Sequence, residues 1–119
     1  MAWNFTSDKP VYLQIAERVI KIVLAGEYKP GEQIPSVRQL ALEAAVNPNT
    51  VQHAFSELEN EGLIISKGTM GRFVTEDAQI IEACRRKLAM QLVDHFIETM
   101  DQLLISKEEA IAMIKEGEQ

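Results

Sequence analysis

The sequence holds a single cysteine, Cys84, so it can form neither an internal disulfide nor a cysteine-based zinc site. No apolar run approaches the roughly 18 residues that a membrane-spanning helix needs. The first residues show neither the basic nor the apolar stretch of a signal peptide. These absences predict a cytoplasmic protein that has no contact with a membrane.

Motifs of the common enzyme classes are missing as well. Residues 68–71 (GTMG) are not followed by the Lys-Ser/Thr of a phosphate-binding loop, no HExxH occurs, and His53 and His95 lack a nearby nucleophile. On a helix, His95 could share a face with Asp94 and Glu98 as metal ligands, but such scattered residues usually form a solvated stripe. We expect neither an enzyme nor a bound cofactor or metal.

The length and the charge distribution favour one small domain with an extension. The 119 residues, 46% of them hydrophobic and 25% charged, are typical of one globular domain. The net charge of −6 disfavours nucleic acid as a partner. However, residues 1–75 hold seven Lys/Arg against eight Asp/Glu, whereas residues 76–119 hold five against ten. The acidity therefore lies in the last third of the chain.

Three helices are predicted in the first half of the chain. Apolar residues recur at helical spacing over residues 10–25. Ser36 stands three residues before Gln39, which forms a capping box that opens a second, short helix. Asn47, followed by a proline, opens a third helix over residues 48–61. The second and third helices, joined by a tight turn, predict a helix-turn-helix.

A hairpin and two further helices complete the predicted fold. Residues 63–65 and 73–74 are β-prone, and the segment between them carries two glycines and two cations. Residues 76–105 contain no Gly or Pro and predict one long helix, and Ser106 opens a last helix. The expected fold is therefore mainly α with a small β-hairpin, a winged helix-turn-helix domain followed by a two-helix region.

The predicted helix-turn-helix and hairpin suit duplex DNA. The second helix of such a pair enters the major groove, and the wing lies along the backbone or the minor groove. Arginine's bidentate fork at Arg38 suits guanine, and the capped helix N-termini add partial positive charge. The predicted DNA-binding residues are Ser36, Arg38, Gln39, Asn47, Asn49, Thr50, Gln52, His53, Lys67, Gly68 and Arg72.

The long helix predicts a second chain as a partner. Its apolar residues form two adjacent stripes with the spacing of a straight helix, a face too broad for one short helix to cover. A symmetric homodimer is the usual solution, and it would bind a pseudo-palindromic operator. We therefore expect a DNA-binding domain over residues 9–75 and a dimerisation region over residues 76–119. The predicted dimerisation residues are Ile81, Cys84, Leu88, Leu92, Val93, Phe96, Ile97, Met100, Leu103 and Leu104.

Several segments resemble a known family. Residues 10–15 (PVYLQI) and 26–41 (GEYKPGEQIPSVRQLA) are similar to the amino-terminal half of the GntR winged-helix regulators. Residues 47–51 (NPNTV) and 58–64 (LENEGLI) resemble their recognition helix and its exit into the wing. The short tail, residues 76–119, resembles the YtrA-like subgroup, in which a pair of helices dimerises. The resemblance implies a repressor that binds an operator as a homodimer, although the sequence itself does not distinguish repression from activation.

The chain departs from the family pattern at positions that bear on the operator. Many relatives carry arginine where this chain has Pro48 and Gln52, and YtrA-like proteins often carry Arg or Lys in place of His53. In the wing, Gly68 takes the place of the usual arginine, and Thr69 that of the following glycine. The operator sequence is expected to differ accordingly.

Two further possibilities concern partners other than DNA. A winged-helix adaptor would bind protein through the same helix and wing, but it would expose apolar residues there, whereas this face is polar with cations at its edges. The tail is too short to enclose a ligand pocket within one chain. Any small-molecule effector would therefore bind at the dimer interface or between the two regions.

Overall fold

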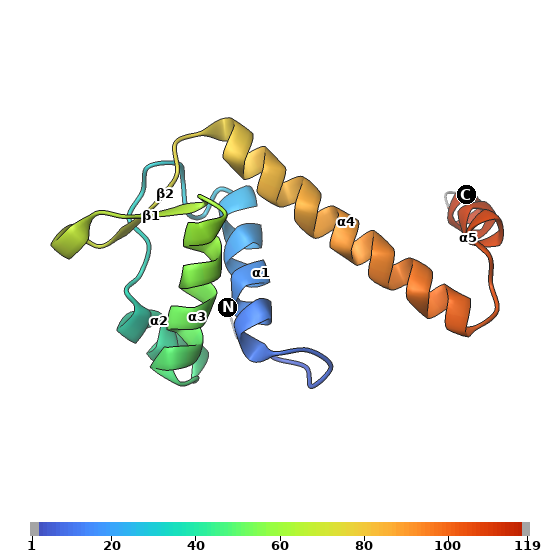
Figure 1. The fold of residues 1–119 in the computed structure, drawn as a ribbon, viewed down its shortest axis with the longest axis horizontal. Coiled ribbons are helices and arrows are strands. Elements are labelled where there is room, and N and C mark those ends of the chain that lie inside the picture. The colour runs from blue at the N-terminus through green and yellow to red at the C-terminus, as the bar shows by residue number, and fades with distance from the viewer. Residues whose placement is uncertain (1–2, 118–119) are drawn as a thin grey trace. The chain divides into compact units, whose positions relative to one another are not determined.

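The computed structural model describes residues 3–117, and the chain divides into two compact units, Met1–Arg85 and Arg86–Gln119. In residues 3–117 one antiparallel hairpin accompanies five α-helices, which confirms the expected fold class (Figure 1). Within residues 3–117 no helix is long and apolar enough to cross a membrane. The elements are α1 (Val11–Leu24), α2 (Val37–Ala44), α3 (Pro48–Asn60), β1 (Ile64–Ser66), a 3-10 turn (Gly68–Met70), β2 (Arg72–Val74), α4 (Ala78–Gln102) and α5 (Lys107–Glu116).

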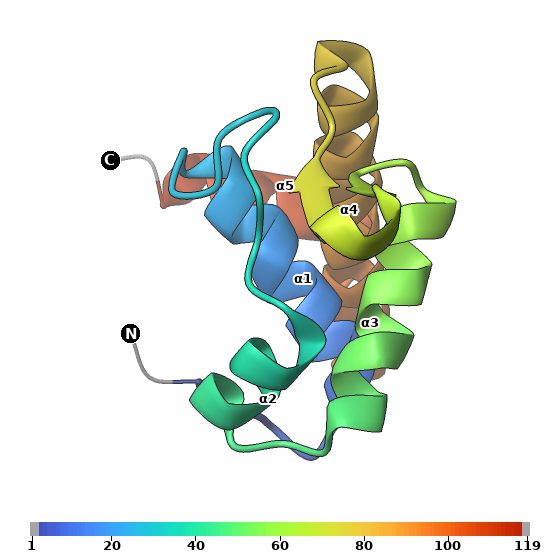
Figure 2. The ribbon, with the colours of Figure 1, turned by 90° about the vertical axis from the view of Figure 1, so that its left-hand side faces the viewer.

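The core of the first unit lies between α1, α2 and α3, and Figure 2 shows these three helices together. Helix α3 contributes Val51, Phe55 and Leu58, all of them buried, and they share one face because helical neighbours lie three and four residues apart. Ile15 of α1 and Leu40 of α2 are buried as well. Burying each large side chain contributes about 1.5–3 kcal/mol to folding. Because this face of α3 is committed to the core, its opposite face is left for other contacts.

Side-chain caps define where α2 and α3 begin. Ser36 Oγ accepts a hydrogen bond from Gln39 N at 3.1 Å, and Gln39 Oε1 accepts one from Ser36 N at 2.9 Å. The predicted capping box is therefore confirmed. Asn47 Oδ1 accepts from Asn49 N at 2.8 Å, with proline at the first helical position, as the sequence predicts. Each cap satisfies backbone N–H groups that lack a partner within the helix.

The turn between α2 and α3 passes through a left-handed residue. Ala45 has φ 57° and ψ 48°, a conformation that is costly for any residue with a Cβ. Its N–H donates to Leu42 O at 3.3 Å, and Val46 N–H donates to Ala41 O at 3.0 Å. These bonds close the end of α2 and let the chain reverse into α3 within a few residues.

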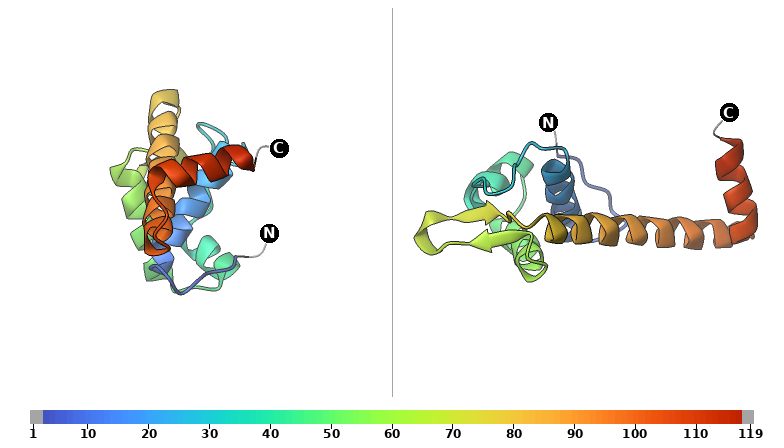
Figure 3. Two further views of the ribbon diagram at one scale, coloured as in Figure 1. Left: turned by 90° about the vertical axis from the view of Figure 1, so that its right-hand side faces the viewer. Right: turned by 90° about the horizontal axis from the view of Figure 1, so that it is seen from above.

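The hairpin is braced on both sides of β2. Figure 3 shows its two strands side by side. In their antiparallel register Ile64 pairs with Val74 and Ser66 with Arg72. On the other edge of β2, Gln33 forms a β-bridge with Phe73. The loop that precedes α2 therefore lies against β2 like a third strand, and the wing is tied to the helices.

Cys84 lies near the start of α4 within the first unit. It is 4% exposed, and its S–H donates to Glu61 Oε2 at 3.9 Å. This packing lies within one chain, so the predicted role of Cys84 in dimerisation stays a prediction.

Candidate nucleic-acid interface

Helix α3 presents a polar face opposite the core. Asn49, Gln52 and His53 are exposed there, and Thr50 is half-buried. Neither α2 nor α3 has an acidic residue in its first turn, and the first acid of α3 is Glu57. The N-terminal half of α3 therefore offers hydrogen-bonding groups and the positive end of a helix dipole without a nearby carboxylate of its own.

Helix α2, which packs against α3, carries one exposed cation. Arg38 is exposed in its first turn. Ser36 and Gln39 are also exposed, but their side-chain oxygens already accept the hydrogen bonds of the capping box. Asn47 likewise serves as the cap of α3. These three residues cap the helix starts and remain exposed, so their predicted contacts with DNA stay predictions beside that of Arg38.

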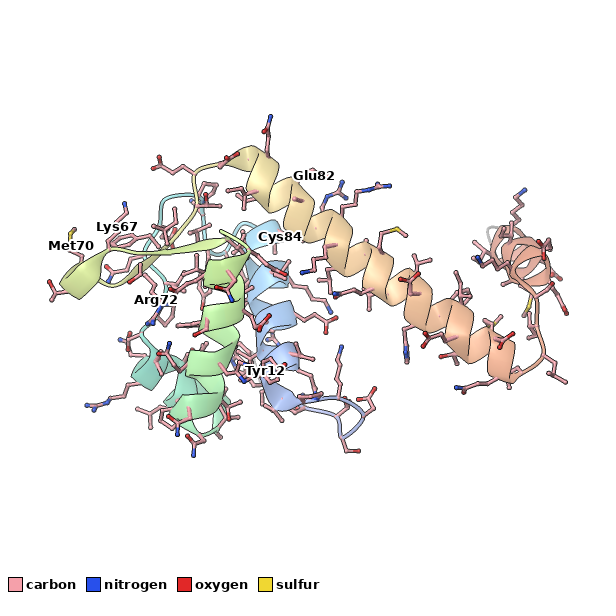
Figure 4. All side chains as sticks on the ribbon, in the orientation of Figure 1. Tyr12, Lys67, Met70, Arg72, Glu82 and Cys84 are labelled. Atoms are coloured by element: carbon pink, nitrogen blue, oxygen red, sulfur yellow. The ribbon has the colours of Figure 1, made fainter. Side chains whose placement is uncertain are left out.

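His53 is held by a contact that the sequence analysis did not predict. Its ring is stacked on Tyr12 of α1, with centroids 3.5 Å apart and planes tilted by 8°. Figure 4 labels Tyr12 on the side of α1 that faces α3. The stack orients an exposed imidazole on the polar face, so Tyr12 supports this surface from behind.

The tip of the wing carries Lys67 and Met70, which Figure 4 shows at its end. Lys67 is exposed, and its Nζ lies 4.7 Å from the ring centroid of Phe73. Met70 is 67% exposed, while its carbonyl oxygen accepts a hydrogen bond from Gln33 Nε2 at 2.8 Å. The predicted residue Gly68 is exposed beside them. The wing therefore presents one cation at a tip whose backbone is fixed from the loop before α2.

Arg72 differs from Lys67 in its surroundings. Its Nε donates to Glu59 Oε1 at 2.7 Å, and its side chain is 24% exposed. Its Cζ lies 5.3 Å from the ring centroid of Phe55, which belongs to the core. The predicted DNA contact of Arg72 is untested, but its guanidinium is engaged with α3.

The residues that the sequence analysis missed share one property. Tyr12, Gln33 and Glu59 support the polar face or the wing through partners from other elements. Gln33 and Met70, for example, are 37 positions apart. No local motif indicates such a pair.

The sequence of the chain is similar to those of known bacterial regulators. A family model described as "Bacterial regulatory proteins, gntR family" matches residues 11–74. The uncharacterized HTH-type transcriptional regulator YhcF of Bacillus subtilis is 38% identical over 112 residues, 94% of this chain and 93% of that protein. The HTH-type transcriptional repressor YtrA of Bacillus subtilis is 42% identical over 73 residues, 61% of this chain and 56% of that protein.

Solved structures show the same likeness. A GntR family transcriptional regulator from Listeria monocytogenes has a TM-score of 0.80 and 38% identity, covering 94% of this chain and 98% of that one. A structure of AraR(DBD) in complex with operator ORE1 has a TM-score of 0.55 and 26% identity, covering 63% of this chain and 94% of that one. The residues that the family model matches, 11–74, include the polar face of α3 and the wing.

Proposed function

This chain belongs to the GntR family of bacterial transcriptional regulators, and from that premise we propose that it is a repressor that binds a pseudo-palindromic operator as a homodimer. Its relatives are transcriptional regulators and not enzymes. The name of YtrA supports repression, and the AraR complex supports an operator as the ligand. In this proposal α3 enters the major groove and the wing lies on the backbone or in the minor groove.

The observation that carries the proposal is the polar face of α3. Its first two turns expose Asn49, Gln52 and His53, with no carboxylate among them, and Arg38 is exposed on the helix packed against α3. Amide, imidazole and guanidinium groups are the ones that pair with base edges in the major groove. A protein-binding adaptor would instead present apolar side chains at this face.

The test is DNA binding by the full chain and by Arg38→Ala. The probe is the fragment upstream of the chain's own gene, titrated at several salt concentrations beside a random duplex of equal length. We expect Arg38→Ala to lose about 1–3 kcal/mol of specific binding, which is roughly 5–150-fold in affinity. Arg86→Ala removes an exposed arginine from the second unit and serves as the matched control. Equal affinity of the wild type for the two DNAs at moderate salt would contradict the proposal.

The proposed homodimer rests on exposed apolar side chains in the second unit. On α4 these are Met90, Leu92, Val93 and Phe96, each between 41% and 47% exposed, and in the turn after α4 Leu103 is 65% and Leu104 92% exposed. Helix α5 adds three more, Ile111, Met113 and Ile114. Monomeric proteins rarely expose contiguous apolar surface of this kind. A second copy, which brings an identical surface, is the occupant that we propose.

The oligomeric state is tested with an introduced charge. Leu92→Glu places a carboxylate on the apolar surface of α4, where dimerisation would bury it without a partner. We expect sedimentation to show a dimer for the wild type and a monomer for this variant. Leu42→Glu alters a leucine of α2 that is 79% exposed, and this control variant should remain a dimer. A wild-type chain that sediments as a monomer at micromolar concentration would rule out the homodimer.

A further inference from the structure

Arg72 is placed by its strand toward α3. Side chains alternate between the two faces of a strand, so Arg72 and Val74 share one face of β2. Val74 is 1% exposed, which identifies this face as the one turned toward the core. Figure 4 shows Arg72 where the hairpin meets the helices, whereas Lys67 lies farther out along the wing. The side chain of Arg72 therefore lies against α3 and is only partly exposed to solvent.

The guanidinium of Arg72 contacts three residues along one side of α3. Its Nε donates to Glu59 Oε1 at 2.7 Å, and its Nη2 donates to Gln52 Oε1 at 3.4 Å. Its Cζ lies 5.3 Å from the Phe55 ring centroid, between these two contacts along the helix. Positions three, four and seven apart lie on the same side of a helix, so one planar fork spans two turns. The carboxylate of Glu59 neutralises the charge that Arg72 would otherwise offer to a phosphate.

These contacts determine how the amide of Gln52 is turned. Arginine only donates hydrogen bonds, so the oxygen of the Gln52 amide must face Arg72 and the nitrogen must face away. On that other side, Gln52 Nε2 donates to Ser56 Oγ at 3.4 Å, a contact that a base could replace. A glutamine held in this way offers a donor to the DNA. Its matching partners are base-edge acceptors such as guanine O6 and N7 or thymine O4, and not the cytosine amino group.

We propose that Arg72 is a positioning residue that sets the base preference at the operator position contacted by Gln52. In this role Glu59 holds the guanidinium of Arg72 by an ion pair, and Arg72 in turn orients the amide of Gln52. Arg72 does not itself bind phosphate. This inference rests on the proposed DNA-binding function, and it replaces the sequence-based prediction that Arg72 contacts DNA. It also links the wing to α3, because the residue that orients Gln52 belongs to β2.

The test uses the charge-neutral double variant Arg72→Met/Glu59→Gln of the full chain. Methionine keeps an apolar stem over Phe55, and the paired removal of both charges leaves the long-range field on DNA unchanged. Binding sites are selected from duplexes with a randomised core, and affinities for the selected site are measured against salt. We expect the double variant to relax the preference at one position per half-site and to lose about tenfold in affinity. The slope of log affinity against log salt should stay the same.

Two controls distinguish a positioning role of Arg72 from a direct contact between Arg72 and phosphate. They are the variant Lys67→Met and the double variant made in a chain that also carries Gln52→Ala. Lys67→Met removes an exposed cation from the same wing and should lower the salt slope by about one without changing the base preference. In a Gln52→Ala background, the double variant should cause no further loss of preference. Arg72→Lys keeps a cation for Glu59 but lacks the fork that also reaches Gln52, so it should relax the same position even if the double variant does not fold.

The outcomes distinguish the two proposals. If the wild type selects no sequence over random duplexes, the proposed function fails, and this inference fails with it. If the wild type selects a site and every Arg72 variant that folds keeps the full base preference, the positioning role is overturned while the function stands. A salt slope lowered by about one in the double variant, as for Lys67→Met, would identify Arg72 as a phosphate contact and would also overturn it.

Discussion

Gly71 at the end of the wing tip gives the most direct test of how the wing is held. Its φ of 109° and ψ of −160° lie in a region that only glycine adopts readily. A Cβ added at this position would lie 2.5 Å from Nε2 of Gln33, the group that donates to Met70 O. Gly71→Ala therefore strains the backbone and also displaces the side chain that fixes the tip.

The backbone strain and the lost hydrogen bond together give an estimate of how much Gly71→Ala lowers the free energy of unfolding. A non-glycine residue in such a conformation costs about 1–3 kcal/mol. Loss of the bond from Gln33 to Met70 adds about 1 kcal/mol, the typical net value of one hydrogen bond. The free energy of unfolding should therefore fall by about 2–4 kcal/mol. At roughly 4–8 °C per kcal/mol for a domain of this size, the melting temperature should fall by about 8–32 °C.

Thermal melts followed by circular dichroism at one fixed protein concentration measure this change. The matched control is Gly68→Ala in the same tip, where φ is 58° and an added Cβ meets nothing within 4 Å. That variant should lose only about 1–2 kcal/mol, the cost of the left-handed conformation alone. If the two variants melt at the same temperature, the hydrogen bond from Gln33 to Met70 does not stabilise the wing, and the prediction for Gly71→Ala is wrong.

Two further predictions concern stability away from the wing tip. Burial raises the pKa of Glu17, but the hydrogen bond and charge of Lys9 and the charge of Lys21 outweigh it, so the pKa lies below the ordinary 4.5. Because a lowered pKa stabilises the fold only while the group is ionised, Glu17→Gln should cost up to about 1 kcal/mol at neutral pH. In urea titrations this cost should shrink as the pH falls below 4.5, and a constant cost would contradict the assignment. Ala45→Gly should raise the free energy of unfolding by about 0.5–1 kcal/mol, since glycine relieves the left-handed turn, and a lower melting temperature would contradict this.

The parts of the fold that could be predicted from the sequence are those whose causes are local. The capping box of Ser36 and Gln39 lies within four residues and appears as predicted. The long helix was predicted over residues 76–105 and is observed as Ala78–Gln102, a small difference because helix ends depend on tertiary contacts. The hairpin likewise appears at the expected place, with the first strand shifted by one residue and the second longer by one residue at its start.

The parts that could not be predicted depend on residues far apart in the sequence. Nothing near Arg72 in the sequence indicates that its guanidinium will form an ion pair with Glu59. The burial of Cys84 depends on how α4 begins beside Glu61, and its helical spacing alone placed it on the apolar stripe. Composition and periodicity indicate which side chains are apolar or charged, but only the packing of elements decides which of them stay available to a partner.

The segment around Gln33, which forms a β-bridge with Phe73 of β2, affects the order in which the domain folds. Helices form from contacts between near neighbours, whereas the bond between Gln33 and Met70 closes a loop of 37 positions, which is entropically costly and slow. The segment that braces the wing leaves the ribosome well before the hairpin it supports. We therefore expect the wing to be the last part of the DNA-binding unit to form and the first to open. Affinity for DNA is thus expected to appear later in refolding than helical structure.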